Sequence, residues 1–290
     1  LPIFCSVDAG LTLMTAGVAY AKPHLEVSTT VGGADAGEYL VRVQNPDSEA
    51  TSGVLEVRHP YSDRAVSRQP FAVPAHTTRY FRLPGDASLR LDVVAVTRDE
   101  QPIHAQQRRA GEGTIIVFDI PPRDDQRLQD LRIHTANATA VLAHATFDET
   151  TGAPILGQRA TSYEGVSLVL LRSNVFLQLP AAEREALVGW VRTGGALALA
   201  TTDLRDLEGL TDLVGAVKGT STDGKTTKWT GSRLSSTSFG VGADLGLGRV
   251  LLTPVDLWSP EANGNAQVQE QLLSLAVSSP DLRHRRAGSR

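Results

Sequence analysis

The sequence contains one cysteine, Cys5, in 290 residues. A single thiol cannot form an intrachain disulfide, and it cannot supply several sulfur ligands to a zinc ion. The seven histidines show no H-x-H or H-E-x-x-H spacing, so we expect no metal site and no cofactor. His134 and His144 are expected at the surface or at a sheet edge. The glycines of 242–248 precede an expected strand, so they predict a hairpin turn rather than a phosphate-binding loop.

Basic residues are not in excess. Lys and Arg number 28 against 32 Asp and Glu, which gives a formal net charge of −4. Binding to nucleic acid through phosphate neutralisation is therefore not expected. Beyond the N-terminal segment, the longest aliphatic run is Val166–Leu171, far short of the roughly 20 residues that cross a bilayer. We therefore expect membrane contact only through the N-terminal segment or through an anchor outside this sequence.

Residues 1–21 are mostly apolar or small and end in Ala19-Tyr20-Ala21. This spacing of small residues is typical of a signal-peptide cleavage site. We expect an exported protein that is periplasmic or otherwise associated with the cell envelope. The alternative is that the segment forms the first strand of the fold. At the other end, residues 281–290 are basic and predict a flexible, solvated tail.

The composition predicts about two folded domains, because 41% of the residues are hydrophobic and the chain is long enough for two cores. Between 22 and 110, apolar and polar residues alternate with a period of two. This alternation, broken by turn-prone Gly, Pro and Asn, predicts an all-β antiparallel sandwich. We expect strands at Leu25–Val27, Tyr39–Val43, Val54–Arg58, Phe71–Val73, Arg79–Leu83 and Leu89–Val93.

The pattern changes after the polar stretch Arg98–Gly113, which predicts a linker with a domain boundary near residue 111. From 111 to 280, continuous apolar runs alternate with helical patterns. Such runs are typical of buried parallel strands, and the alternation predicts a doubly wound α/β sheet of flavodoxin-like type. We expect strands at Thr114–Phe118, Ala140–Ala143, Val166–Leu171, Ala196–Ala200 and Arg249–Thr253, and helices at Asp124–Ile133, Pro180–Thr193 and Val268–Val277.

Two segments resemble known families. The segment VRVQNPDSEATSGVLEVRHP, followed by FAVPAHTTRYFRLP, resembles bacterial Ig-like envelope modules, which implies a spacer or docking role. Residues 162–203, with an aL-x-x-W-V-x-x-G-G helix and a returning apolar strand, resemble a class I glutamine amidotransferase-like domain. The later G-L-G-R-V strand is similar to the periplasmic or membrane-associated branch of that superfamily. The resemblance implies an Ig-like module followed by an amidotransferase-like domain.

The resemblance also implies a catalytic cysteine on the turn after a central strand, with a distant histidine as its base. In this chain the matching turn is Thr201-Thr202-Asp203, and no cysteine follows residue 21. Glutamine hydrolysis is therefore not expected. The sequence predicts a non-catalytic relative, a pseudoenzyme whose scaffold remains without the nucleophile.

Several polar side chains follow the expected strands of the second domain. They are Asp119, Ser173, Asn174, Thr202, Asp203 and Asp256. The carboxyl ends of parallel strands meet at a ligand crevice, so these groups are candidates for binding a polar ligand or a cation. The alternative is that they cap helices and begin turns.

A polar segment, Lys218–Arg233, predicts a long loop over the same edge of the sheet. Its Trp229 is either an exposed ligand anchor or a side chain tucked under the loop. In the first domain, Arg42, Arg58, Arg79 and Arg82 either form a basic strip or simply face water.

The leading hypothesis is an exported, non-catalytic envelope protein whose amidotransferase-like domain binds or scaffolds an envelope protein or a small polar ligand. One alternative is a hydrolase that uses the strand-end carboxylates. Another is a glycan-binding module that uses Trp229.

Overall fold

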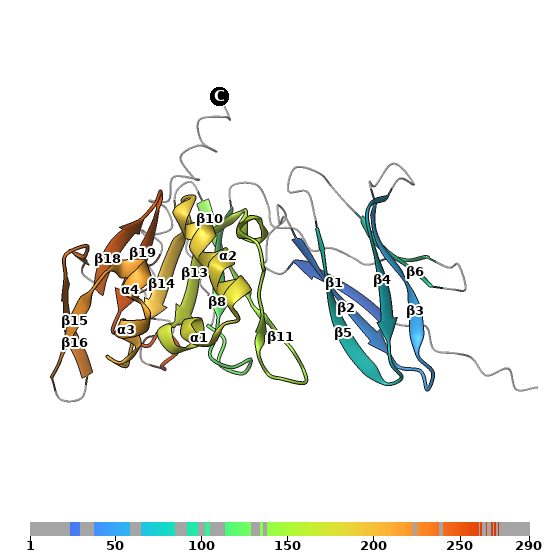
Figure 1. Cartoon of the computed structure of the whole chain (residues 1–290), viewed down its shortest axis with the longest axis horizontal. Helices are drawn as coiled ribbons and strands as arrows, with labels where there is room; N and C mark the ends of the chain where they lie inside the picture. The colour runs from blue at the N-terminus through green and yellow to red at the C-terminus, as the bar shows by residue number, and fades with distance from the viewer. Residues whose placement is uncertain are drawn as a thin grey trace, which may run out of the picture.

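The computed structural model describes residues 24–29, 38–58, 65–84, 92–97, 102–104, 114–128, 134–135, 138–222, 225–237 and 240–260, together with residues 262, 265, 268, 270 and 272. The predicted signal peptide at 1–21, the boundary near residue 111 and the basic tail at 281–290 lie outside these ranges. The described residues form a β unit and a larger mixed α/β unit (Figure 1).

The β unit consists of two antiparallel sheets. One sheet has the strand order β1-β2-β5 and the other has the order β4-β3-β6-β7. The strands are β1 (His24–Thr29), β2 (Glu38–Asn45), β3 (Thr51–Arg58), β4 (Ala65–Val73), β5 (Thr77–Pro84), β6 (Asp92–Thr97) and β7 (Pro102–His104). The chain changes sheet between β2 and β3, between β4 and β5, and between β5 and β6.

The core of this unit follows the predicted alternation. Tyr39, Val41 and Val43 alternate along β2 and join Leu55 and Val57 of β3 in one buried cluster. Because successive side chains of a strand point to opposite faces, every second residue enters the core. The sequence therefore located most of the sandwich strands correctly.

The strand expected at Leu89–Val93 is described only from Asp92 onward, since residues 85–91 lie outside the described part. The described strand β6 runs from Asp92 to Thr97 and pairs with β3, so it continues past the expected end through the apolar run Val93–Val96. β7 also lies inside the stretch expected to be a linker.

The four arginines of the sandwich do not form one basic strip. Arg42 pairs with Glu149, Arg58 with Glu56, and Arg82 with Glu183. Two of these partners belong to the second unit. These three arginines therefore do not simply face water, whereas Arg79 is exposed, as the alternative expected.

The second unit is built on a mixed eight-stranded sheet with the order β17-β18-β19-β14-β13-β8-β10-β9. Its five central strands, from β19 to β10, are all parallel. The strands of the sheet are β8 (Thr114–Ile120), β9 (His134–Thr135), β10 (Ala138–His144), β13 (Val166–Arg172), β14 (Ala196–Ala200), β17 (Ser235–Thr237), β18 (Gly240–Leu245) and β19 (Gly248–Thr253). All five strands predicted for this unit are present, and they are the parallel ones.

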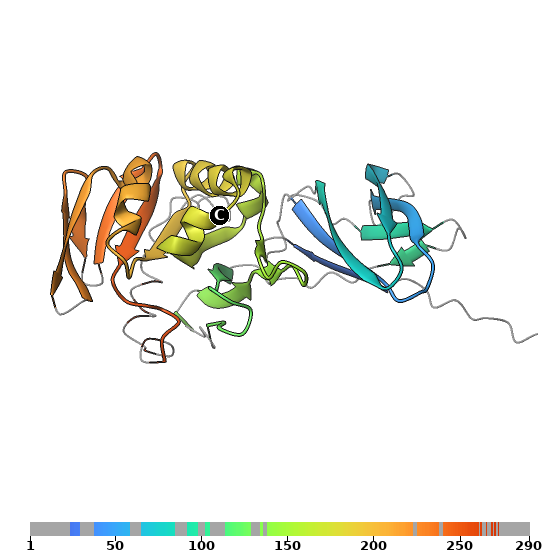
Figure 2. The same ribbon diagram turned by 60° about the horizontal axis from the view of Figure 1, so that its bottom comes forward.

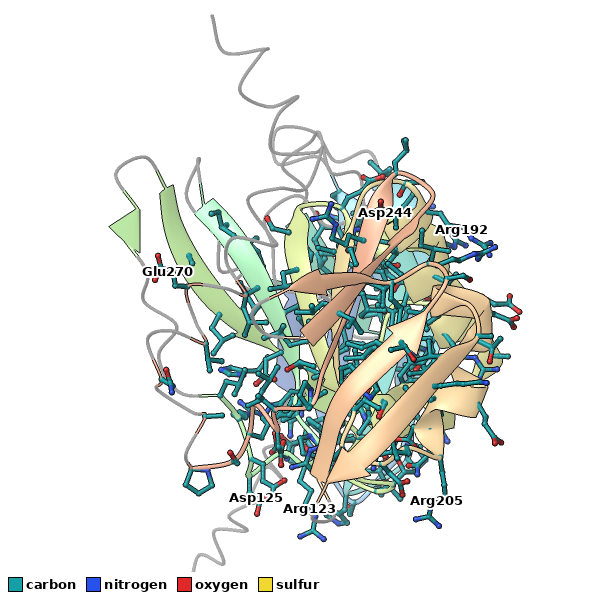
Figure 3. The ribbon with its side chains drawn as sticks, turned by 90° about the vertical axis from the view of Figure 1, so that its left-hand side faces the viewer. Arg123, Asp125, Arg192, Arg205, Asp244 and Glu270 are labelled. Carbon is teal, nitrogen blue, oxygen red and sulfur yellow. The ribbon has the colours of Figure 1, made fainter. Side chains whose placement is uncertain are left out.

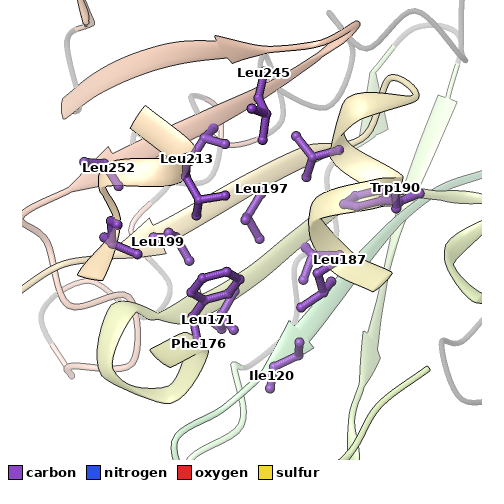
Figure 4. Packing of buried hydrophobic residues seen from close by; sticks show 14 of the residues in the cluster. Ile120, Leu171, Phe176, Leu187, Trp190, Leu197, Leu199, Leu213, Leu245 and Leu252 are labelled. Carbon is purple, nitrogen blue, oxygen red and sulfur yellow. The ribbon is translucent and has the colours of Figure 1, made fainter. Parts of the chain in front are cut away.

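One face of the sheet is covered by helices, as Figure 2 shows from a second direction. They are α1 (Ser173–Gln178), α2 (Ala181–Arg192), α3 (Asp206–Gly209) and α4 (Thr211–Val214), preceded by the 3₁₀ helix η1 (Ala160–Tyr163). Phe176 of α1 and Leu187 of α2 pack on Leu171, Leu197 and Leu199 of the sheet (Figure 4). This packing buries Leu187, Trp190 and Val191 on one side of α2.

The other face of the sheet packs against Leu128, Leu257, Trp258 and Leu272. The first three belong to irregular segments after β8 and β19, while residues 268, 270 and 272 have helical backbone. The rest of the helix expected at Val268–Val277 lies largely outside the described residues. The structure thus shows a mixed sheet with most of its described helical residues on one face.

Helix α2 begins and ends close to the predicted residues. Pro180 is its N-cap rather than its first helical residue, and Thr193 is its C-cap. Gly194 follows with a φ of 125°, a conformation that side-chain-bearing residues avoid. Proline before the helix and glycine after it were the sequence signals for these two ends.

The helix expected at Asp124–Ile133 is wrong where the structure describes it. Residues 124–128 form a turn and irregular backbone, and residues 129–133 lie outside the described part. The backbone N–H of Leu128 donates to the carboxylate of Asp119 at 3.0 Å. This hydrogen bond holds Leu128 against the sheet, and residues 124–128 do not form a helix.

The loop expected at Lys218–Arg233 is instead a β-hairpin. Strands β15 (Val217–Thr222) and β16 (Lys225–Gly231) pair antiparallel and form a separate two-stranded sheet at the end of the molecule far from the sandwich (Figure 1). The polar, Gly-, Thr- and Ser-rich composition had predicted a loop, but threonine also favours strands.

The predicted hairpin turn around Gly246 joins β18 to β19. Gly246 has a φ of 63°. A Cβ on Gly248 would overlap the carbonyl oxygen of Val191. These glycines let the turn pack directly against the end of α2. Within the described ranges, no helix is long and apolar enough to span a membrane.

Candidate functional site

The polar candidates lie where the parallel strands of the second unit end. Figure 3 shows this end through Arg123 and Asp125, which follow β8, and Arg205, which follows β14, while Arg192 and Asp244 mark the opposite end. In an open parallel sheet, ligands bind at the carboxyl ends of the strands. A ligand site of this unit is therefore expected at this end of the sheet.

Asp119 is the most buried of these candidates, with an exposure of 0%. It lies inside β8 rather than after it, because the strand continues to Ile120. Its Oδ2 accepts hydrogen bonds from the Leu128 N–H and from Nδ1 of His144, each at 3.0 Å, and its Oδ1 accepts from Nε1 of Trp258 at 2.9 Å. A buried carboxylate needs such donors, since it has lost its water.

His144 ends β10, and the parallel pairing of β10 with β8 sets it directly beside Asp119. A carboxylate oxygen accepts hydrogen bonds, so this contact is a hydrogen bond when Nδ1 of His144 carries the ring hydrogen. The imidazole is partly exposed, with 26% of the side chain accessible. Among the described residues no hydrogen bond is found at its Nε2. The ring is thus fixed in place through Nδ1, and Nε2 is the nitrogen that a ligand can reach.

Asp256 is paired with Arg172, the last residue of β13. The Arg172 Nε and Nη2 donate to the two carboxylate oxygens of Asp256 at 3.1 and 2.8 Å. The guanidinium also lies over the Trp258 ring, 5.8 Å from its centroid. Such a two-pronged pair fixes the orientation of both side chains.

Together these contacts connect five side chains, which we name the strand-end network: Asp119, His144, Arg172, Asp256 and Trp258. The network lies at the ends of β8, β10 and β13. The neighbouring strands β8 and β13 mark the point where the strand order reverses, so that the connections leave in opposite directions. Trp258 occupies the centre of the network and fastens the segment after β19 to the sheet.

Ser173 and Asn174 begin α1. The Ser173 hydroxyl is buried and donates to Oδ2 of Asp206 at 2.6 Å. Asn174 is exposed, and its side-chain oxygen accepts the N–H of Val175. Asn174 thus bonds locally in the first turn of α1, as the turn-forming alternative anticipated, whereas Ser173 links α1 to α3 and to the carbonyl of Ala200.

The turn that would carry a nucleophile follows β14. Thr201 is fully buried, and its Oγ1 has no partner among the described residues. Thr202 is exposed. Asp203 accepts hydrogen bonds from the side chain of Arg205 and from its backbone N–H, and these bonds lower the pKa of Asp203. The three residues have irregular backbone directly after the strand, and the turn itself begins at Leu204.

Trp229 is a core residue. Only 6% of it is exposed, and it belongs to the cluster that fills the helix-covered side of the sheet. The structure therefore corrects the idea of an exposed Trp229 anchor in favour of the tucked alternative. Its Nε1 is buried without a partner among the described residues.

The structure brings only some of the predicted residues together. Asp119 and Asp256 belong to one network, whereas among the described residues no hydrogen bond or ion pair links Thr202, Asp203 or Asn174 to it. Sequence reasoning missed Arg172 and Trp258 and expected His144 at the surface or at a sheet edge, without a link to Asp119. The available signals were weak: Arg172 directly follows an apolar run, and Trp258 stands two residues after Asp256.

Within the described ranges, no group of three or more His, Cys, Asp or Glu side chains is arranged to hold a metal ion. Comparison with known protein families finds no family model that matches this chain, and no curated protein matches it. The site must therefore be judged on its own geometry.

Proposed function

We propose that this protein is a non-catalytic binding and docking protein of the bacterial envelope, made of an Ig-like module and an amidotransferase-like α/β domain. The ligand face of the α/β domain is its carboxyl edge around the strand-end network. The ligand is a small polar molecule or a polar segment of an envelope protein.

The strand order supports the fold part of this proposal. Numbered along the chain, the five parallel strands β8, β10, β13, β14 and β19 lie in the order 2-1-3-4-5, which is the order of flavodoxin-like doubly wound sheets. The changes of sheet within the sandwich are of the kind that Ig-like folds make. The module order also agrees with that of the periplasmic branch which the sequence resembles.

One observation carries the non-catalytic part. The side chains near the expected nucleophile are already engaged or blocked: Ser173 binds Asp206, Asp203 binds Arg205, and Thr201 is buried. A nucleophile needs an adjacent base and access to substrate. Thr202 alone is exposed, and among the described residues it has no hydrogen-bonded base.

Ligand-observed NMR with a library of small polar molecules tests this proposal. We expect binding that is lost in His144→Ala and retained in Arg192→Ala, because Arg192 lies at the opposite end of the sheet (Figure 3). Equal binding by both variants, or no binding by the wild type, would contradict a ligand face at the carboxyl edge.

A second candidate function is a hydrolase, favoured by the pair of His144 and Asp119. A histidine held by a buried carboxylate is the arrangement of a general base in many hydrolases. In this reading Nε2 of His144 takes a proton from a water or hydroxyl. Turnover of an ester or amide substrate that disappears in His144→Gln would support this candidate over the first.

A further inference from the structure

The sandwich and the α/β unit meet through polar side chains. On the α/β side the contact is made by a short hairpin of β11 (Thr146–Phe147) and β12 (Pro154–Ile155), by η1 and by α2, and Figure 1 shows β11 facing the sandwich. At the outer part of the contact, Arg42 pairs with Glu149 at 2.6 Å, and the Tyr80 hydroxyl donates to the carbonyl of Phe147 at 3.4 Å. Glu149 is exposed, so this outer pair is solvated.

The inner part of the contact is buried. Nη2 of Arg82 in β5 donates to the carbonyl oxygen of Leu156 and to Oε1 of Glu183 in α2, both at 3.0 Å. The Ser162 hydroxyl of η1 donates to Oε2 of Glu38 in β2 at 3.1 Å. Both Glu38 and Glu183 are buried. The interface therefore encloses two carboxyl groups close to one guanidinium.

The pair of Arg82 and Glu183 is only half formed. Nε of Arg82 and Oε2 of Glu183 are buried, and neither has a partner among the described residues. A carboxylate that has lost its water and keeps one free oxygen is costly to hold ionised. Removing the charge by protonation relieves that cost, and so does opening the interface to water.

We propose that docking of the sandwich onto the α/β unit is linked to protonation of Glu183, so that acid closes the interface and higher pH loosens it. Polar interfaces between domains of one chain commonly allow relative motion. The titratable groups facing Glu183 are Arg82 from β5, Glu38 from β2 and Tyr163 from η1. Tyr163 stays neutral because burial raises its pKa.

The sign follows from the direction of the shift. Burial raises the pKa of Glu183 and Glu38 adds to the rise, while Arg82 and a backbone hydrogen bond from Leu156 lower it, and the net effect is a raised pKa. A carboxyl group whose pKa is higher in the docked state binds its proton more tightly there. Its contribution to docking is complete below the ordinary glutamate pKa and is lost as the pH rises through the raised value.

Distance measurement between two spin labels on the full chain tests the proposal. Labels are attached to Val66→Cys in the sandwich and Leu247→Cys in the α/β unit, with Cys5→Ser, since Val66 and Leu247 are 49% and 72% exposed. We expect one narrow distance distribution at about pH 5 and a broader one at about pH 8. Glu183→Gln, which is permanently neutral, keeps the narrow distribution at both.

Two further variants make the test decisive. Glu149→Gln alters only the solvated pair and retains the wild-type response to pH. Arg82→Gln removes the cation that lowers the Glu183 pKa, so the broadening moves to higher pH. A wild-type distribution that is the same at both pH values, or a Glu183→Gln response equal to that of the wild type, would overturn the proposal. Circular dichroism verifies that each variant is folded.

Discussion

The indole Nε1 of Trp258 donates a 2.9 Å hydrogen bond to Oδ1 of Asp119, which lies 139 residues earlier in the chain. The bond is buried and joins the segment after the last parallel strand to the end of the first one. It anchors the strand-end network, because the same tryptophan supports Arg172 and the same aspartate orients His144.

Trp258→Phe removes this bond and leaves a buried carboxylate oxygen without its donor. We expect a loss of about 1–3 kcal/mol in the free energy of unfolding, measured with urea. Trp229→Phe is the matched control, because Nε1 of Trp229 has no partner among the described residues. The control should lose clearly less, and equal losses would argue against a special role for the Asp119 bond.

Thr201→Val tests the buried hydroxyl directly after β14. The substitution keeps the shape of the side chain and removes a polar atom that has no partner among the described residues. We expect unchanged stability or a gain of about 1 kcal/mol in thermal or urea unfolding. A loss of that size would show that the hydroxyl makes a bond that stabilises the fold.

Gly248→Ala places a methyl group against the carbonyl oxygens of Val191 and Gly195. Since backbone atoms cannot move aside easily, we expect a loss of roughly 3 kcal/mol or more. Gly152→Ala is the comparison. Gly152 has a φ of 66° but no neighbour within 4 Å of the added carbon, so only backbone strain of about 1–2 kcal/mol applies. Similar losses at both sites would contradict the close packing of the turn on α2.

Export can be tested with a fusion of residues 1–30 to a reporter enzyme that is active only outside the cytoplasm. We expect activity and a mature N-terminus at Lys22, after the Ala19-Tyr20-Ala21 pattern. An inactive fusion that retains residue 1 would contradict the assignment of residues 1–21 as a signal peptide.

The parallel strands could be predicted because they are buried on both faces. Runs such as Leu168–Leu171 and Ala196–Ala200 are apolar throughout, and a continuous run is the local sign of such a strand. The ends of α2 could also be predicted, since Pro180 and Gly194 act through their own backbone preferences. In these cases the residues of the element itself were sufficient for the prediction.

The strand-end network could not be predicted in the same way. His144 lies beside Asp119 only because β10 and β8 pair in parallel with that register. Trp258 contacts Asp119 although the two residues are 139 positions apart in the sequence. The β15–β16 hairpin was missed because its threonines, lysines and glycines are also typical of loops. Contacts between residues distant in the sequence depend on the whole fold.

The measurement that tests the central claim most directly is turnover by the purified full chain on glutamine and on a broad panel of ester, amide and glycoside substrates. The account predicts no rate above that of Thr202→Ala and His144→Ala, since among the described residues Thr202 has no hydrogen-bonded base. Turnover by the wild type that either substitution abolishes would contradict it.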